Sequence, residues 1–487
     1  MIDEYLELQK IVNDNDGLNN AVGRSLSSTI TKEGIKIVAS GTTGYGTLSS
    51  NKPAVYLFTN VDYDVNTEKD DSKNIFSNSV DLAGGQIWTH LATLKCPNSN
   101  LLDQFGTSID ISDKTIVVGA SYTDNSVGAA YIFDTPVSTS SLTWTQTSKL
   151  VASDGKISDF FGISVSTNEG YVFVGASGHS STGAVYVFKS IQGDNFRSWT
   201  EQAKLSSNVK GGFFGRSISL SSKYSVISSY GENQQAGAIY VYNNVGEVWS
   251  QTAKLTPPDL SFGDLFGFSV DINKNNILAT SLYDNAKGKY SGSAYIFSFL
   301  QQSKSWAFNS KLVASDETAD DSFGYSVALC SSSDNGQSFA DRDLAAVSTI
   351  YKNNSIGKTY IFADLATTLQ NPSSQWTQLS ALIPKVVTTQ QYFGRSLTIT
   401  PECDNIFVSS YGSIPENGHF YNFHVLVPKL IEIKHVNIFP TVIVIFSVGT
   451  IIITTLLSHN YNFYRVFSRY CANCIYQTLQ SKIKYCC

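Results

Sequence analysis

Short runs of alternating apolar and polar residues fill most of this chain, and they recur in the same order along it. The runs "TIVVGAS", "YVFVGAS" and "NIFVSSY" are rich in β-branched residues, and "GAAYIF", "GAVYVF" and "GSAYIF" combine glycine with aromatic residues. Such runs, bounded by Gly, Asn, Asp and Ser, predict short strands. Two further runs accompany them: one begins Phe-Gly-x-Ser, and one ends in Lys-Leu after a tryptophan. We therefore expect a repeating unit of four strands and an all-β fold.

The Phe-Gly-x-Ser motif sets the register of the repeat. It occurs six times, and a seventh copy with Val22 in place of phenylalanine lies upstream. The glycines of the seven copies are Gly23, Gly106, Gly162, Gly215, Gly267, Gly324 and Gly394. A period in this range indicates repeated supersecondary units. Glycine lets the backbone turn tightly into the following strand.

All six tryptophans keep the same register. They precede a repeat glycine by 18 residues, or by 16 in the case of Trp199, and Tyr5 occupies the matching place before Gly23. The six are Trp88, Trp144, Trp199, Trp249, Trp306 and Trp376. Large aromatic side chains at fixed places are suited to filling the space between repeats. We interpret both motifs as architecture and not as an active site.

Seven units of four strands describe a seven-bladed β-propeller. The pattern Trp…Lys-Leu…Phe-Gly-x-Ser…Val-Gly-Ala…Gly-x-x-Tyr-x-Phe resembles the FG-GAP repeat, which builds the propeller head of integrin α subunits and of many bacterial and protist surface proteins. The resemblance covers about residues 1–427. It implies an adhesion or ligand-binding role, and it implies that the tryptophan strand is the outer strand of the preceding blade. The strand Tyr5 to Ile11 is then expected to close the last blade against a strand near Gly418 to Val427, which removes an open edge.

The composition changes after the propeller. Residues 436–457 ("VNIFPTVIVIFSVGTIIITTLL") carry no charge, and 22 residues at about 1.5 Å each give a helix of roughly 33 Å. Because backbone groups in lipid must satisfy one another, we predict a transmembrane α-helix, with a buried strand or core helix as the alternative. The expected domains are a propeller at 1–428, a linker at 429–435, the helix at 436–457 and a basic tail at 458–487.

The charge pattern suggests an orientation. The tail has no acidic residue, and its basic residues are Arg465, Arg469, Lys482 and Lys484. The positive-inside rule then places the tail in the cytoplasm and the propeller outside the cell or in a lumen. No signal peptide is visible, so a cytosolic propeller stays open. The formal net charge of −6 falls mainly on the propeller, which argues against nucleic acid as a partner.

Cysteines and one sequon add little to this. The propeller cysteines are Cys96, Cys330 and Cys403, an odd number without a pairing pattern. The glycosylation sequon is Asn353-Asn354-Ser355. The tail cysteines are Cys471, Cys474, Cys486 and Cys487. They are candidates for lipidation near a membrane, with zinc binding or unmodified thiols as alternatives.

We predict no cofactor. Integrin-like repeats often carry a calcium loop between the first two strands of a blade, and only unit six has room for one here. Its polar residues are Asp334, Asn335, Asp341 and Asp343. Their spacing departs from that of the family, and the alternative is a solvated polar loop.

The loops before the Phe-Gly motifs are acidic. They contain Asp154, Asp159, Asp259, Asp264, Asp316, Glu317, Asp320 and Asp321. Loops on a rigid scaffold commonly carry binding sites, so this face is the candidate ligand surface; the alternative is that the acids keep the domain soluble. His179 lies in a predicted loop of the same face without a sequence-evident partner, and we interpret it as an exposed residue.

No nucleophile–base constellation is evident, so we do not expect an enzyme. The favoured function is a single-pass membrane protein whose propeller binds a protein or glycan ligand in adhesion or recognition. One alternative is a membrane-tethered cytosolic scaffold for protein partners. Another is a hydrolase or lyase at the mouth of the central channel.

Overall fold

The protein is described by a computed structural model. It describes residues 5–11, 22–42, 53–61, 87–96, 103–136, 142–191, 193, 196–331, 343–364, 376–384, 390–410, 419–425, 441–445 and 451–455. The chain divides into two compact units, Met1–Val425 and Leu426–Cys487.

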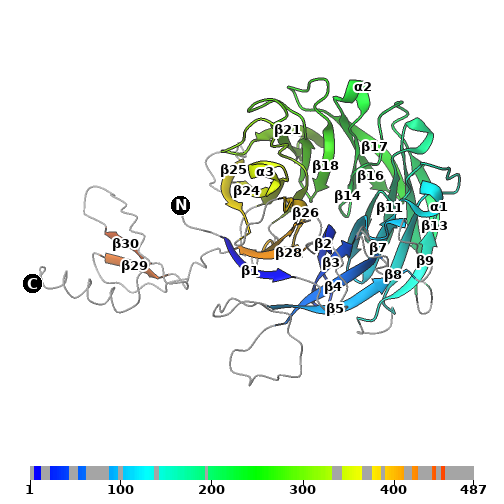
Figure 1. Cartoon of the computed structure of the whole chain (residues 1–487), viewed down its shortest axis with the longest axis horizontal. Helices are drawn as coiled ribbons and strands as arrows, with labels where there is room; N and C mark the ends of the chain where they lie inside the picture. Colours follow the sequence, from blue (N-terminus) through cyan, green and yellow to red (C-terminus); the bar gives the residue numbers. More distant parts are fainter. Residues whose placement is uncertain are drawn as a thin grey trace, which may run out of the picture. The chain divides into compact units, whose positions relative to one another are not determined.

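The first unit is a seven-bladed propeller of antiparallel four-stranded sheets. Figure 1 shows the sheets around a common axis, with strands such as β2, β14 and β26 near the axis and strands such as β9 and β13 at the rim. Six blades consist of consecutive strands. They are blade 1, β2 (Val22–Ile30), β3 (Lys36–Thr42), β4 (Ala54–Val61) and β5 (Ile87–Lys95); blade 2, β6 (Ser108–Ser112), β7 (Thr115–Ala120), β8 (Ala129–Asp134) and β9 (Thr145–Leu150); blade 3, β10 (Ser164–Asn168), β11 (Tyr171–Ala176), β12 (Ala184–Ile191) and β13 (Ser198–Leu205); blade 4, β14 (Ile218–Leu220), β15 (Tyr224–Ser229), β16 (Ala238–Val245) and β17 (Val248–Leu255); blade 5, β18 (Phe266–Ile272), β19 (Asn276–Ser281), β20 (Ser293–Leu300) and β21 (Ser305–Leu312); and blade 6, β22 (Val327–Cys330), β23 (Leu344–Thr349), β24 (Lys358–Asp364) and β25 (Trp376–Leu382).

The seventh blade joins the two ends of the propeller. It contains β26 (Phe393–Ile399), β27 (Asn405–Ser410), β28 (His419–Val425) and, as its outermost strand, β1 (Tyr5–Ile11). The register runs from Tyr5 opposite Val425 to Ile11 opposite Phe420. This pairing confirms the closure expected from the sequence.

The Phe-Gly motifs lie at the joints between blades. All seven motif glycines have φ between 87° and 109°, a region that side chains rarely adopt. A Cβ atom on Gly162 would lie 2.3 Å from the carbonyl oxygen of Ala129 in the preceding blade. The motif phenylalanine before it, Phe161, forms a bridge to Gly128, the glycine that opens the third strand of that blade. Glycine is therefore required here by both conformation and space.

The tryptophans pack each blade against the one before it. Trp249 in blade 4 meets Phe173 of blade 3 edge to face at 4.8 Å, and Trp88 in blade 1 meets Phe407 of blade 7 at the same distance. Five of the six tryptophans are buried, and Trp199 is partly exposed. The apolar core accordingly consists of clusters between neighbouring blades, such as the one around Trp249.

A disulfide links two blades near the closure. Cys330 at the end of β22 in blade 6 is bonded to Cys403 in the turn between β26 and β27 of blade 7, with Cα atoms 5.7 Å apart. Cys96 is buried and is not part of this bond. The absence of a pairing pattern in the sequence was misleading, because the two cysteines lie 73 residues apart and meet only when the ring is formed.

The second unit differs from its prediction. β29 (Thr441–Ile445) and β30 (Ile451–Thr455) form an antiparallel pair where a helix over 436–457 was expected. Both strands consist of Ile, Val and Thr, whose branched Cβ atoms favour extended backbone. No helix in the described ranges is long and apolar enough to cross a membrane, so the transmembrane helix is not confirmed. The tail at 458–487, with its four cysteines, lies outside the described residues.

Candidate ligand-binding face

The Phe-Gly motifs share one end of the propeller with two sets of loops, and we call this end the loop face. One set joins the second and third strands of a blade, and the other joins the outermost strand to the next blade. Backbone hydrogen bonds tie the sets together, such as Gly178 N to Asp159 O and Gly231 N to Gly212 O. Four loops of the first set contain a short turn: α1 (Thr123–Ser126), η2 (His179–Ser181), α2 (Glu232–Gln235) and α3 (Lys352–Ser355).

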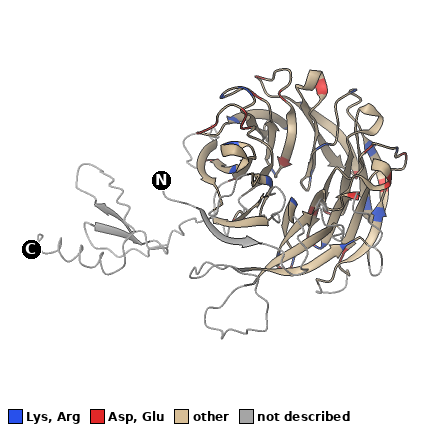
Figure 2. Cartoon of the chain, viewed as in Figure 1, with Lys and Arg blue, Asp and Glu red and all other residues tan. Residues whose placement is uncertain are grey.

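A tyrosine, a lysine and an acid meet near the rim of the loop face in several blades. In blade 4, the Tyr240 hydroxyl and the Lys254 ammonium each donate to the carboxylate of Glu232 at 2.6 Å. Glu232 is 1% exposed. We call these groups the rim clusters; the others are Tyr186, Lys204 and Asp154 in blade 3, Tyr295, Lys311, Asp284 and Asp259 in blade 5, and Tyr360, Lys358 and Asp316 in blade 6. Figure 2 shows acidic and basic residues interspersed around the ring, as this pairing requires.

His179 belongs to the rim cluster of blade 3, and its predicted exposure was wrong. The side chain is 4% exposed, with Nδ1 2.7 Å from Asp159 and Nε2 2.7 Å from the Lys204 ammonium. Because the ammonium can only donate, Nε2 accepts and Nδ1 donates to Asp159. His179 begins its turn as Glu232 begins the turn of blade 4, so its place repeats a structural position.

The same cluster holds a strongly ionised acid. Hydrogen bonds from Lys204 and Tyr186 lower the pKa of Asp154 to about 2. The lysine is therefore neutralised within its own blade.

Four of the eight acids predicted as a ligand surface stabilise their own loops instead. Asp159, Asp264 and Asp321 each accept a hydrogen bond from the backbone N–H three residues earlier, at 2.6 to 2.8 Å. Glu317 does the same with Ala314 at 2.9 Å, and burial raises its pKa to about 7. These are local turns of the kind that Asp favours. Asp320 alone among the predicted acids makes no side-chain hydrogen bond or ion pair within the described residues, and it is exposed.

The calcium candidate is only partly described. Asp343 accepts a hydrogen bond from the Asn276 side chain at 2.7 Å, which fixes it against blade 5. Asp334, Asn335 and Asp341 lie outside the described residues. Among the residues that are described, no three His, Cys, Asp or Glu side chains are grouped as metal ligands.

A different kind of cluster lies at the axis. The residue x of Phe-Gly-x-Ser is Arg216 in blade 4, Phe268 in blade 5, Tyr325 in blade 6 and Arg395 in blade 7. The Arg216 guanidinium lies 5.8 Å from the Phe268 ring, and the Arg395 guanidinium lies 4.9 Å from the Tyr325 ring. The two rings are 5.5 Å apart. We call these four residues the axial cluster; it forms a continuous chain of contacts across four blades.

Arg216 has an unusual electrostatic environment. Within the described part of the chain it has no hydrogen bond and no ion pair, and its contact is with the Phe268 ring. Burial lowers the pKa of the guanidinium, and the titratable groups near it are Tyr230 and Tyr122. The side chain nevertheless stays partly accessible to solvent.

Exposed aromatic side chains cover the loop face around this cluster. Phe213 stacks on Tyr230 at 5.3 Å, and Tyr283 packs on Tyr290 at 4.9 Å. The exposed fractions are 38 to 46% for Tyr122, Phe213, Tyr283, Tyr290 and Tyr351. Four of these five, all except Tyr290, recur just after the second strand of a blade or just before a Phe-Gly pair, a pattern that was not recognised from the sequence.

Below the loop face, two buried acids connect the innermost strands. Asp110 of blade 2 accepts hydrogen bonds from Ser27 of blade 1 at 2.7 Å and from Ser166 of blade 3 at 3.0 Å. Asp271 of blade 5 accepts from Ser219 of blade 4 at 2.6 Å and from the Leu329 N–H of blade 6 at 2.7 Å. Burial raises the pKa of Asp271 to about 6. Each acid thus joins three blades.

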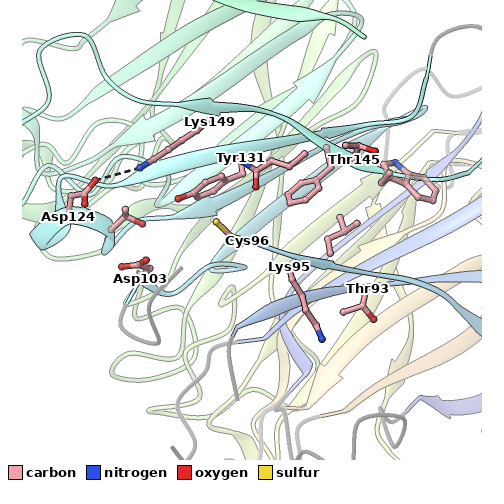
Figure 3. Close-up of a pocket in the computed structure, with 13 residues that line it drawn as sticks. Thr93, Lys95, Cys96, Asp103, Asp124, Tyr131, Thr145 and Lys149 are labelled. Atoms are coloured by element: carbon pink, nitrogen blue, oxygen red, sulfur yellow. Dashed lines mark ion pairs between the residues drawn. The ribbon is translucent and has the colours of Figure 1, made fainter. Parts of the chain in front are cut away.

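A pocket of about 830 Å³ lies between the outermost strand of blade 1 and blade 2. Figure 3 shows Cys96, Tyr131 and Lys149 around it, with Lys149 paired to Asp124 at 3.6 Å. The equivalent lysine–acid contacts in blades 3 to 6 are 2.6 to 2.8 Å long, so the rim cluster of blade 2 is looser. Residues 97–102 beside Cys96 are outside the description, and we assign no ligand to this pocket.

Solved structures with distant similarity to this chain include the following three. Two solved structures named "putative 6-phosphogluconolactonase" are similar: one from Bacteroides uniformis (12% identity, 75% of this chain and 87% of that chain, TM-score 0.46) and one from Bacteroides fragilis (11%, 75% and 86%, 0.43). A protein of unknown function from Dyadobacter fermentans has 13% identity over 87% of this chain and 100% of its own, with a TM-score of 0.40. Similarity this distant carries no argument about activity. No curated protein matches the chain.

The family comparison is specific. The model of the FG-GAP repeat matches residues 88–133, 144–188, 249–297 and 306–362. Each match begins at one of the register tryptophans and ends in the third strand of the next blade. The chain thus contains FG-GAP repeats, and its seven blades with interblade Phe-Gly joints fit an FG-GAP repeat β-propeller.

Proposed function

We propose that this propeller recognises a protein ligand through its loop face, in cell-surface adhesion or recognition. The observation that carries the proposal is the set of exposed aromatic side chains around the axial cluster. Tyrosine, phenylalanine and arginine are enriched in protein interfaces, and tyrosine and arginine dominate their energetic centres. The loops that hold them are fixed by a rigid ring, which favours preformed recognition.

The acids of this face support the same interpretation indirectly. Many of them are engaged in the rim clusters and turns, and the exposed aromatic groups add apolar surface beside them. Aromatic pairs such as Phe213 and Tyr230 offer flat apolar area at low entropic cost. A glycan could use the same rings, and it remains an outcome of the test.

The proposal is tested by comparing variants on the loop face with a variant elsewhere on the propeller. The full chain in detergent is screened on immobilised extracellular proteins and on a glycan array. The double variant Phe213→Gln/Tyr283→Gln is expected to lose at least about tenfold in affinity for the ligand found. Phe308→Gln, at an equally exposed aromatic of β21, is the matched control and should bind normally. Equal loss in both variants would contradict a role for the loop face, and hits on glycans alone would replace the protein ligand.

We also propose that the propeller lies outside the cell or in a lumen, attached to a membrane through the uncharged segment 436–457. Two features support the compartment. The Cys330–Cys403 disulfide suits an oxidising environment, and Asn353 of the sequon is exposed on the loop face. The uncharged segment itself supports the attachment.

The compartment has a direct test in cells that make the full chain. We expect glycosidase to shift its electrophoretic mobility, with Asn353→Gln as the unshifted control. We also expect Cys330 and Cys403 to resist alkylation until a reductant is added. Closing a loop of 73 residues is worth about 4 kcal/mol in the chain-entropy account, so Cys330→Ser should destabilise the propeller by 2 to 4 kcal/mol. Free thiols and no shift would indicate the cytosolic scaffold instead.

A further inference from the structure

We propose that the axial cluster receives a carboxylate of an acidic protein ligand, held by Arg216 and Arg395. This inference rests on the proposed function, since it names the chemistry recognised at the centre of the same face. The four residues come from four consecutive blades, and only the closed ring brings them together.

The first step is the geometry of the cluster. The rings of Phe268 and Tyr325 lie next to each other, and one guanidinium lies beside each ring on the far side. Contact with an aromatic ring fixes the plane of a guanidinium while leaving N–H groups available. The cluster therefore combines two cations with two aromatic surfaces.

The second step concerns the carboxylate partner that the rim lysines have and that Arg216 lacks among the described residues. In the rim clusters, the lysines Lys204, Lys254, Lys311 and Lys358 each have a carboxylate within 2.8 Å. Arg216 has none among the described residues, although burial already lowers its pKa. A desolvated charge without a partner is unfavourable, and natural proteins retain such groups mainly at functional sites. An incoming anion would supply the partner.

The third step is the kind of anion. Two positive groups exclude a cationic ligand by repulsion, and the guanidinium fork matches a carboxylate in a bidentate contact. The rings between the two arginines give apolar surface for the methylene groups of a glutamate or aspartate side chain. The surrounding tyrosines and phenylalanines favour a protein source for that carboxylate over an acidic sugar.

The test uses the full chain and labelled probes of equal charge number: hexaglutamate, hexalysine and hexagalacturonate. We expect hexaglutamate to bind and hexalysine not to bind. Arg216→Gln and Arg395→Gln should each weaken hexaglutamate binding at least about tenfold. Lys210→Gln is the matched control, because Lys210 is an exposed cation in a loop of the same face and makes no side-chain hydrogen bond or ion pair with the residues that the structure describes. It should change the affinity by less than about twofold.

Thermal unfolding shows whether Arg216 has only a structural role. We expect the Tm of Arg216→Gln to be unchanged or higher, since the variant removes a partly desolvated charge that has no ion pair among the described residues. A lower Tm together with unchanged hexaglutamate binding would overturn the inference, as would wild-type protein that binds no hexaglutamate. Binding of hexagalacturonate alone would overturn the protein source. If Phe213→Gln/Tyr283→Gln loses its ligand while Arg216→Gln keeps it, the axial inference fails and the proposed function stands.

Discussion

The rim and the axis of the loop face are built from the same repeat, yet they treat charge in opposite ways. At the rim, Lys254 reaches the buried carboxylate of Glu232 and the Tyr240 hydroxyl. At the axis, Arg216 meets an aromatic ring. The rim clusters join side chains of the loops and the two outer strands of a blade, whereas the axial cluster uses one position at the innermost strand of each blade. The difference lies in whether the fold itself supplies the acid.

This difference separates architecture from recognition. Burial alone would lower the pKa of Lys254, but its bonds to Glu232 and Tyr240 keep that pKa above the ordinary value. Burial does lower the pKa of Arg216, because nothing compensates for it in the described structure. A satisfied cluster stabilises the blade, and an unsatisfied one leaves interaction energy available for a ligand.

The largest effect is expected from breaking a rim cluster. Glu232→Ala leaves the Tyr240 hydroxyl and the Lys254 ammonium without their shared acceptor. We expect a loss of about 3 kcal/mol in unfolding free energy, measured by urea denaturation. Hexaglutamate binding by the folded fraction should be unchanged.

A conservative variant controls for this. Glu232→Gln keeps the size and one acceptor oxygen, so it should lose less than Glu232→Ala. Rim variants that abolish hexaglutamate binding while the protein stays folded would contradict the separation of the two regions.

The sequence predicted the ring because the repeat states the same geometry seven times. Gly162 and its six counterparts, with the register tryptophans, determined the number of blades. The offset of Tyr5 from Gly23 predicted the closure by β1, which the structure confirms. The local pattern was sufficient for these features because each depends only on where the motif residues stand in the sequence.

Features that depend on several blades were not predictable in this way. The Cys330–Cys403 bond and the axial cluster require knowing which side chains meet between blades, and the burial of His179 likewise requires knowing how the loops of blade 3 pack together. Residue x of Phe-Gly-x-Ser varies so much that it looked unimportant. Because this position recurs at every innermost strand, alignment of the repeats would have placed Arg216 and Arg395 in one ring.

An intermediate effect is expected from the acid below the axis. The pKa of Asp271 is about 6 in the folded protein and near 4 in an unfolded chain. Between these values the folded state holds a proton that the unfolded state has lost, so stability falls as pH rises from about 4 to about 6. Asp271→Asn should remove this pH dependence. The fall in unfolding free energy between pH 4 and pH 6 should then be smaller than in the wild type by at most about 3 kcal/mol, measured from urea midpoints at pH 4, 5, 6 and 7.

The control for this slope is Asp320→Asn, which removes the same charge from an exposed loop. Its profile should follow that of the wild type. Parallel profiles for wild type and Asp271→Asn would show that the three-blade contact of Asp271 is not sensitive to protonation.

The smallest effect is expected from a substitution that places a carboxylate beside Arg216 in the axial cluster, as the rim clusters already have beside their lysines. Phe268→Glu places a carboxylate where the ring now contacts Arg216, and Phe268→Gln is the matched neutral variant. Both lose the ring, so their comparison isolates the charge. We expect Phe268→Glu to be more stable than Phe268→Gln by about 1 kcal/mol at pH 7, with the difference lost below pH 4 as the carboxylate is protonated. Hexaglutamate binding should be weaker in Phe268→Glu than in Phe268→Gln, because the internal acid competes for the guanidinium. If the two variants are equally stable and bind equally, Arg216 does not lack a partner, and the contrast between rim and axis is not one of charge.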